Sequence, residues 1–159
     1  MTRIVFLLMM SLLCCSLPTR ADTNPPEIET SKKFGNYTVF YNVFPSTDLQ
    51  ADIAARYNIT RANDRVVLNV SLRDSSNGDI RPQRAATTGT YSDLMSNKPL
   101  EFREISELNA IYYIAELRVS NRELLRFDIN VQPIADTEKG EQTSPPLIVT
   151  FTRKFAVDN

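Results

Sequence analysis

Apolar and polar residues alternate along several stretches of this chain, and a period of two is typical of a β-strand with one buried face. The clearest example is residues 65–73. The positions there that are expected to face a core are Val66, Leu68, Val70 and Leu72. The positions expected to face outward are Val67, Asn69, Ser71 and Arg73. Residues 125–131 alternate in the same way, and Pro133 is expected to end that strand.

Other segments are rich in aromatic and β-branched residues, which favour strands. Further strands are predicted over residues 34–44, 83–91, 100–105, 110–119 and 147–157. Within the first of these, one face carries Tyr37, Val39, Tyr41 and Val43. Phe40 and Phe44 lie on the other face, so this strand is predicted to be bent or covered on both sides.

Turns and one helix separate these strands. Residues 74–79 contain Asn-Gly, which suits a turn with positive φ, and residues 97–99 are also predicted to form a turn. Residues 46–57 have apolar positions at helical spacing, namely Leu49, Ile53, Ala54 and Tyr57. They predict a short helix, with Ser46 or Thr47 as a possible N-cap.

The pattern as a whole predicts an all-β fold of about seven strands, with one short helix in the first long connection. No strand–helix–strand rhythm occurs, so the sheets are expected to be antiparallel and to bury one face each against the other. We therefore expect an antiparallel immunoglobulin-like β-sandwich, with a small β-barrel as the alternative. Residues 33–159 are predicted to form a single domain, preceded by a flexible segment over 22–32 that contains Pro25 and Pro26.

Residues 1–21 have the pattern of a cleaved secretory signal peptide. Arg3 supplies a positive charge, residues 4–13 are almost wholly apolar, and small residues precede a cut after Ala21. The apolar run is shorter than the ~20 residues of a bilayer span, which disfavours a retained anchor. Neither Cys14 nor Cys15 follows a small residue, which disfavours a lipoprotein. We expect no transmembrane span after cleavage.

The charge of the predicted mature chain is small and adds little to the prediction of function. Removal of Arg3 and Arg20 with the signal peptide leaves 16 of the 18 basic residues against 19 acidic ones, a net charge of −3. There is no basic block, so the sequence argues against nucleic acid as a partner and against an anionic membrane surface.

Composition excludes several chemistries. The chain has no histidine and no tryptophan, and both cysteines lie in the predicted signal peptide. This excludes histidine-based triads, imidazole metal ligands and thiol nucleophiles from the predicted domain. We expect no cofactor, no metal and no catalytic residue.

Two groups of residues remain as a speculative ligand or partner surface. The charged group is Glu101, Arg103 and Glu104, and the aromatic group is Tyr112 and Tyr113. The acids, with Glu107, would serve a carboxylate-dependent hydrolase only if two of them faced one cleft. The simpler interpretation is a solvated face on which Arg103 or its neighbours pair across strands with Glu116 or Arg118.

The tyrosines, with Tyr37 and Tyr41, would suit a carbohydrate or peptide surface. Successive strand residues point to opposite faces, so one of Tyr112 and Tyr113 is expected in the core and the other exposed or at its rim. Asp74 and Asp79 around Asn77-Gly78 weakly resemble a calcium loop, but a plain turn explains them. Three Asn-X-Ser/Thr sequons, at Asn36, Asn58 and Asn69, matter only in a host that glycosylates secreted proteins.

Several segments together resemble a known family. They are residues 37–44 (YTVFYNVF), 55–61 (ARYNITR), 69–71 (NVS), 100–105 (LEFREI), 110–116 (AIYYIAE), 125–133 (LRFDINVQP) and 155–158 (FAVD). In order and content they resemble the domain-of-unknown-function family 4426, short secreted proteins of Gram-negative bacteria. Asn58 departs from the glycine expected there, but asparagine tolerates the same left-handed backbone. The resemblance implies a periplasmic location and transfers no catalytic residue.

The sequence therefore predicts a periplasmic, non-catalytic module that binds another protein or an envelope component through a strand edge or the end loops. A small-ligand or carbohydrate binder is the alternative, and a carboxylate-dependent hydrolase is a third.

Overall fold

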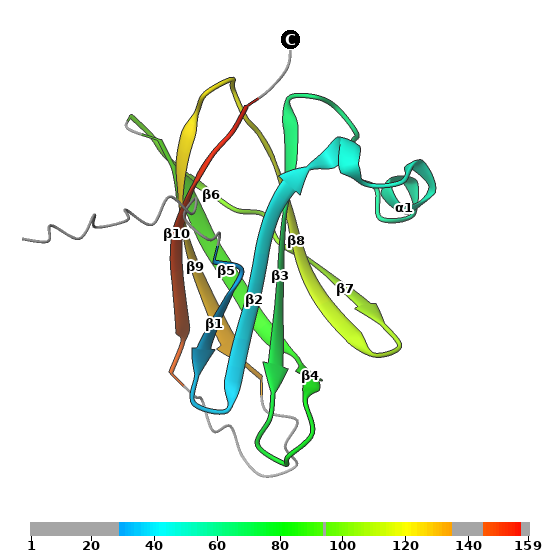
Figure 1. Ribbon diagram of the computed structural model, residues 1–159, viewed down its shortest axis with the longest axis vertical. Coiled ribbons are helices and arrows are strands. Elements are labelled where there is room, and N and C mark those ends of the chain that lie inside the picture. Colours follow the sequence, from blue (N-terminus) through cyan, green and yellow to red (C-terminus); the bar gives the residue numbers. More distant parts are fainter. Residues whose placement is uncertain (1–28, 94, 135–144, 157–159) are drawn as a thin grey trace, which may run out of the picture.

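The computed structural model describes residues 29–93, 95–134 and 145–156. These residues form two antiparallel sheets that face each other (Figure 1). Sheet A has the order β1-β2-β3-β8-β7, with β4 also paired to β3. Its strands are β1 (Ser31–Phe34), β2 (Tyr37–Pro45), β3 (Arg65–Asp74), β4 (Arg81–Gln83), β7 (Arg103–Glu107) and β8 (Ala110–Arg118).

Sheet B has the order β10-β9-β5-β6. Its strands are β5 (Ala85–Ser92), β6 (Asn97–Pro99), β9 (Leu124–Pro133) and β10 (Leu147–Lys154). Since the strands form two separate sheets, the predicted sandwich is confirmed and the barrel alternative is not.

The core lies between the inner faces of the two sheets. The alternating positions of β3 supply Val66, Leu68, Val70 and Leu72, all buried as predicted. An aromatic stack crosses the interface, because the Phe151 ring lies 4.8 Å from that of Tyr41 in sheet A and 4.9 Å from that of Phe127 in sheet B. Offset stacking of this kind adds to the free energy gained from burying the rings.

The described residues contain ten strands where about seven were predicted, and three local features explain the difference. The predicted strand 34–44 is two strands, because Gly35 adopts φ +60° and starts a tight turn between β1 and β2. The predicted strand 83–91 is interrupted at Arg84, where the chain leaves sheet A for sheet B. Residues 97–99, predicted as a turn, form β6 and pair with β5.

The other predicted strands are observed with shifted ends. The strand predicted at 100–105 begins at Arg103, because residues 100–102 carry the chain back from sheet B to sheet A. β1 starts at Ser31, inside the segment predicted to be flexible. β5 passes so close to β9 that a Cβ on Gly89 would lie 2.7 Å from the carbonyl oxygen of Asp128.

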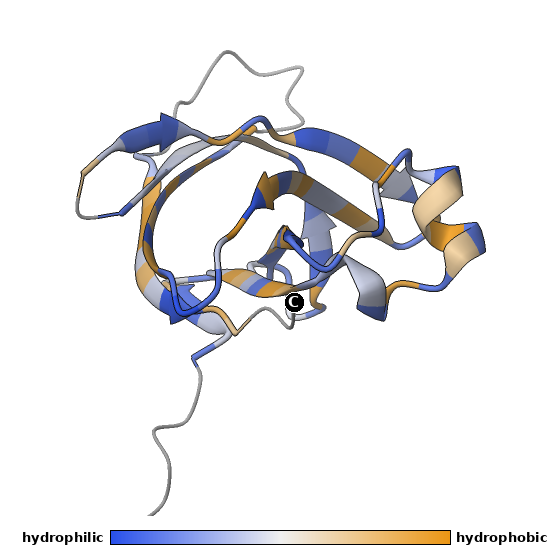
Figure 2. Ribbon diagram, turned by 90° about the horizontal axis from the view of Figure 1, so that it is seen from above, coloured by the Kyte–Doolittle hydropathy of each residue, from blue (hydrophilic) through white to orange (hydrophobic). Residues whose placement is uncertain are grey.

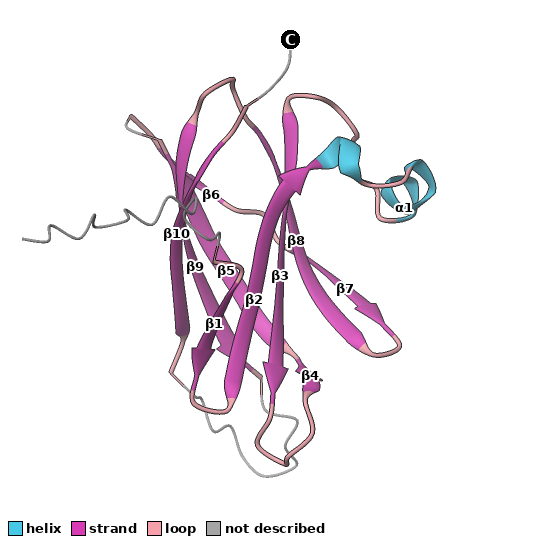
Figure 3. Ribbon diagram, in the orientation of Figure 1, coloured by secondary structure: helices cyan, strands magenta, loops and turns pink. Residues whose placement is uncertain are grey.

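The predicted helix is also present, in two short pieces after β2. They are the 3₁₀ turn η1 (Ser46–Asp48) and the helix α1 (Ala51–Arg56), gathered in one place in Figure 3. The N-cap expected of Ser46 or Thr47 is absent, since neither piece has a side-chain cap. The buried Ser46 hydroxyl instead donates to the carbonyl oxygen of Ala62 at 3.1 Å and accepts from its N–H at 3.0 Å.

This segment lies outside the two-layer body when the molecule is seen from above (Figure 2). It covers part of the outer face of sheet A. Val67, predicted to face outward into solvent, is 0% exposed because Ala54 and Ile59 pack against it. The two-fold periodicity was therefore correct, but β3 is covered on both faces at this position.

Candidate functional site: an apolar cavity on the outer face of sheet A

Residues 46–64 connect β2 to β3 and fold back over sheet A; we call them the excursion. α1 ends in a Schellman arrangement, in which the N–H of Ile59 donates to the carbonyl oxygen of Ala54 (2.8 Å) and that of Asn58 to Ala55 (3.2 Å). Asn58 adopts φ +52°, the left-handed backbone expected of it. This reversal sends Ile59 back toward the sheet, where it is buried.

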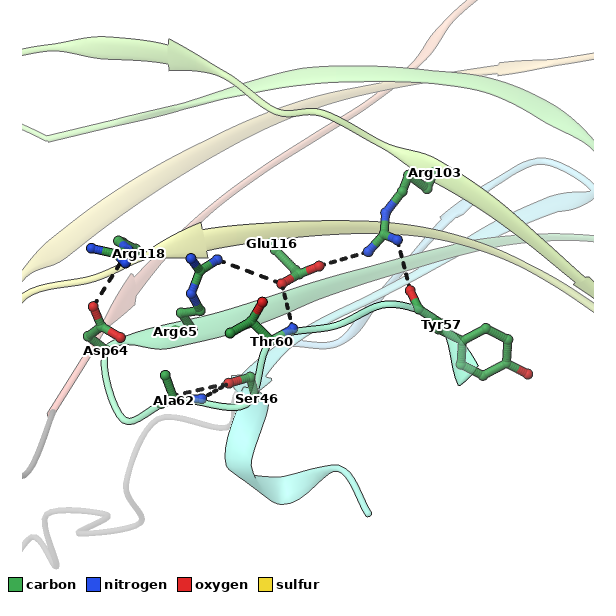
Figure 4. A network of polar contacts seen from close by, with 9 residues as sticks. All are labelled: Ser46, Tyr57, Thr60, Ala62, Asp64, Arg65, Arg103, Glu116 and Arg118. Carbon is green, nitrogen blue, oxygen red and sulfur yellow. Dashed lines mark hydrogen bonds and ion pairs between the residues drawn. The ribbon is translucent and has the colours of Figure 1, made fainter. Parts of the chain in front are cut away.

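A polar network ties the excursion to β3, β7 and β8 (Figure 4). Its centre is Glu116, whose carboxylate accepts from the backbone N–H of Thr60 at 3.1 Å and from Arg103 at 2.7 Å. Arg65 lies 3.8 Å from the same carboxylate. Arg103 also donates to the carbonyl oxygen of Tyr57 at 2.8 Å. The excursion therefore has fixed polar attachments as well as an apolar contact surface.

Between the excursion and the sheet lies a cavity of about 310 Å³, which we call the outer cavity. The excursion contributes Leu49, Ile53, Tyr57 and Ile59 to its walls. Sheet A contributes Phe44, Val67, Asn69, Ile105, Glu107, Tyr112 and Ile114. Ligand sites are typically concave and mostly apolar with a few polar groups, and the outer cavity has this character.

The register of sheet A explains why these residues meet. Asn69 lies opposite Ile114, Ile114 opposite Arg103, and Ile105 opposite Tyr112, so all of these side chains share the outer face. In a sandwich this face is normally polar, because water covers it. Here its apolar positions gather beside the excursion and line the outer cavity.

One contact crosses the outer cavity between its two walls. The Tyr57 hydroxyl donates a hydrogen bond to the Glu107 carboxylate, linking the end of α1 to β7. This hydrogen bond, with desolvation as a smaller contribution, raises the pKa of Tyr57. The acid of the cavity wall is thus already engaged by a neutral donor.

Asn69 has an unusual position. Its Oδ1 atom is buried and has no hydrogen-bond partner within the described residues. Leaving a buried acceptor unpaired costs about 1–3 kcal/mol. Asn69 also lines a second hollow of about 250 Å³ together with Thr30, Phe40, Asn42 and Ser71, which we call the polar shelf. Asn69 therefore stands where the two spaces adjoin.

The five residues predicted as a candidate surface do not lie together. Arg103 and Tyr112 are on the outer face, whereas Glu104 and Tyr113, which are register partners, share the inner face. Glu101 is exposed and precedes β7. Tyr113 is 3% exposed and Tyr112 lines the outer cavity, which is the division that strand alternation predicts.

Glu104 and Tyr113 belong to the crossing between the sheets. Glu104 accepts from Arg84 at 2.6 Å, and this hydrogen bond is the main reason why the pKa of Glu104 lies below its usual value. The Tyr113 hydroxyl accepts from the N–H of Ala85 at 2.7 Å, and burial raises the pKa of Tyr113. These groups hold the chain where it passes from β4 to β5.

The structure separates two of the three acids that were considered for a hydrolase. Glu104 and Glu107 lie on opposite faces of β7, so they do not share one cleft. In the 74–79 turn, Asp74 accepts from the N–H of Ser76 at 2.9 Å and Asp79 from Arg81 at 3.3 Å. Across the described ranges, no group of three or more acidic, histidine or cysteine side chains is arranged to hold a metal ion.

Sequence reasoning did not find the outer cavity, although one signal pointed to it. Apolar residues on both faces of 34–44 indicated a strand covered on both sides, and Phe44 lines the cavity. The alternation in residues 65–73 predicts that Asn69 faces outward, and nothing in the local sequence distinguishes it from Ser71.

Fold and cavity define the class of protein: a two-sheet β-sandwich with a ligand-sized cavity outside its core. The chain belongs to the family described as "Domain of unknown function (DUF4426)", whose profile matches residues 31–158. A DUF4426 family protein from Pseudomonas aeruginosa PAO1 has a similar crystal structure, with a TM-score of 0.66 and 35% identity. The match covers 81% of this chain and 95% of that one.

Two structures of FetP from uropathogenic Escherichia coli strain F11 are similar in fold at 11% identity. One is the protein as isolated after expression in the periplasm, with a TM-score of 0.53, and the other is a copper-bound variant, with a TM-score of 0.52. Each match covers 81% of this chain, and 94% and 90% of the FetP chains respectively. No curated protein matches the sequence. Neither helical piece in the described residues has the length and apolar character needed to cross a membrane.

Proposed function

We propose that this protein is a periplasmic, non-catalytic binding module that takes its ligand into the outer cavity. The observation that carries the proposal is the outer cavity itself, an apolar space of about 310 Å³ on a sheet face that is ordinarily polar. The cavity under the excursion does not contribute to the packing between the two sheets, because the core lies on the other side of β3. The periplasmic location rests on the predicted signal peptide.

The electrostatics around the cavity support binding rather than catalysis. General acid–base chemistry needs a group whose pKa is tuned toward the working pH, with access to the substrate. At the outer cavity, Glu116 is engaged by two arginines and a backbone N–H, and Glu107 by Tyr57. The chain has no histidine to take that role.

Copper, which one FetP structure contains, is not part of the proposal. Copper sites in proteins are built from histidine, cysteine and methionine. This chain has no histidine, Cys14 and Cys15 lie in the predicted signal peptide, and Met95 is the one methionine beyond residue 10. The similarity in fold therefore does not carry copper binding over to this chain.

A neutral fluorescent probe tests the proposal. N-phenylnaphthylamine is uncharged, apolar and dim in water, so its fluorescence should rise when the purified protein (residues 22–159) is added. Ile105→Trp places a larger ring in the cavity wall and should abolish that rise. The matched control is Ile148→Trp, since Ile148 is an exposed isoleucine on β10, which like β7 is an edge strand.

Loss of probe binding in the Ile105 variant with retention in the Ile148 variant would support the outer cavity as the site. Equal binding by both variants, or no binding by the unaltered protein, would refute it. Circular dichroism of both variants establishes that they are folded. A panel of neutral sugars in the same assay tests the carbohydrate alternative, which predicts displacement of the probe.

A further inference from the structure

The polar atoms around the outer cavity indicate which chemical class of ligand it would bind, given the proposed function. The most informative residue is Asn69. Its side chain lines both the outer cavity and the polar shelf, and its buried Oδ1 has no partner in the described part of the chain. Asn42 lies directly opposite Asn69 on β2 and lines the polar shelf.

The charges around the cavity favour a neutral ligand. The lining carboxylate of Glu107 is engaged by Tyr57, and Glu116, which anchors the excursion, is engaged by Arg65 and Arg103. A cation would compete with those arginines for Glu116, and an anion would face Glu107. Asn69 and Asn42 offer uncharged donors and acceptors instead.

An amide side chain carries one carbonyl oxygen and one NH₂ group. It can therefore pair with both the N–H and the C=O of one residue in an extended peptide, because those two groups point to the same side. An alkyl or acyl chain has no donor for the unpaired Oδ1. A sugar presents many hydroxyls, for which the apolar walls of the outer cavity have no partners. The combination of apolar walls with one amide matches an apolar peptide side chain and its own backbone amide.

The chain itself does not supply such an occupant. Outside the described residues and the predicted signal peptide, its large aliphatic residues are Ile28, Leu94 and Val157, each directly next to at least one charged residue. Ile28 directly precedes Glu29, and Val157 precedes Asp158. The occupant is therefore a segment of another molecule.

We infer that the outer cavity takes an apolar side chain of a peptide segment from another protein, and that the Asn69 amide pairs with the backbone N–H and C=O of the residue that carries this side chain. Asn69 is then the residue that makes the outer cavity selective for peptides over other apolar ligands. Asn42 extends the same recognition along the polar shelf.

The experiment compares three neutral competitors of the fluorescent probe. They are the capped tripeptide acetyl-Val-Phe-Val-amide, the same compound with the amide between its first valine and its phenylalanine replaced by an ester, and decanol. The ester keeps the apolar body but lacks one N–H donor. The unaltered protein should bind the amide about 5- to 10-fold more tightly than the ester, the size of one net hydrogen bond.

Asn69→Leu should bring the amide-to-ester ratio close to one. The ratio compares two competitors on the same variant, so a change in probe affinity does not alter it. Asn130→Leu is the matched control, because Asn130 is an exposed asparagine on β9, and it should keep the full ratio. Asn69→Ala is a second variant in case the leucine does not fit. In ¹⁵N-resolved spectra, the side-chain NH₂ signal of Asn69 should shift on addition of the amide.

Probe binding with an unchanged ratio in both Asn69 variants would overturn the inference and leave the proposed function standing. Decanol binding more tightly than the tripeptide, independently of Asn69, would assign the cavity to acyl chains and also overturn it. So would a concentration-dependent dimer in analytical ultracentrifugation that Ile105→Trp abolishes, because the occupant would then be a second copy. Absence of probe binding by the unaltered protein counts against the proposed function itself.

Discussion

β3 has two apolar faces that differ in how completely they are covered. On its inner face, Leu68 and Leu72 are fully buried in the core and pack among the stacked rings of Tyr41, Phe151 and Phe127. On its outer face, Val67 is equally buried, but its cluster contains only Ala54 and Ile59 as other buried members and borders a cavity. The same strand therefore belongs to a filled core and to an incompletely filled cluster.

The inner face therefore accounts for most of the packing that specifies the fold, whereas the outer face retains an unfilled apolar volume. A close-packed interior gains dispersion contacts from every neighbour, and an empty volume forfeits them. On the outer face, the side chains around the cavity lack these dispersion contacts. The polar attachments of the excursion at Glu116 hold it in place where packing alone does not.

The substitution with the largest expected loss of stability lies on the inner face. Phe127→Ala removes a fully buried ring that stacks on Phe151 and contacts Phe155, and should lower the free energy of unfolding by about 3–5 kcal/mol. Urea titration followed by circular dichroism measures it. Ile148→Ala, at an exposed position, should cost less than about 0.5 kcal/mol. Similar costs for the two variants would mean that the inner face is not the dominant core.

A smaller effect is expected at the outer face. Glu116→Gln weakens the pairing with Arg65 and Arg103 and should cost about 1–2 kcal/mol, because the carboxylate is largely buried. The amide of Thr60 should exchange with deuterium faster while amides of the inner face keep their protection, since the excursion can open without the sandwich. Asp79→Asn, in an exposed ion pair with Arg81, should change stability by about 0–0.5 kcal/mol. Uniformly faster exchange in the Glu116 variant would contradict the separation of the two faces.

The smallest effect concerns pH at the crossing between the sheets. The pKa of Glu104 is lowered by Arg84, so its contribution to stability is present above the pKa of an unfolded glutamate and disappears as the pH falls through the lower folded value. Unaltered protein should therefore exceed Glu104→Gln in stability at neutral pH and converge with it in acid. The gap is small because the pair is partly exposed and screened by solvent. A gap that widens in acid would reverse the assigned sign.

Much of the inner core follows from the two-fold pattern, because alternation fixes which side chains of β3 and β9 point the same way. The strand count did not follow, since a turn at Gly35 and a change of sheet at Arg84 use only one or two residues each. Neither interrupts the apolar pattern enough to be seen in the sequence.

The outer cavity depends on contacts that are distant along the chain. Val67 is buried by Ile59. Asn69 lines one cavity together with Ile105 and Tyr112 only because β7 and β8 complete the sheet beside β3. Periodicity reports the direction of a side chain and not what another segment lays over it. Four of the five candidate residues are divided between two faces, as strand alternation predicts, since Arg103 and Glu104 are neighbours in sequence and opposite in direction.

The register of β2 and β3 has a consequence for how this protein family can diversify. Pro45 lies opposite Val66, so the two strands already meet where the excursion begins and ends. A hairpin of this kind is normally joined by two to five residues, and lengthening a surface connection costs little loop entropy. The excursion could therefore vary in sequence and length among relatives while the sandwich beneath it is inherited unaltered. For protein engineering, residues 46–64 are the place to vary one wall of the cavity, while Asn69 and the other lining residues of sheet A stay in place.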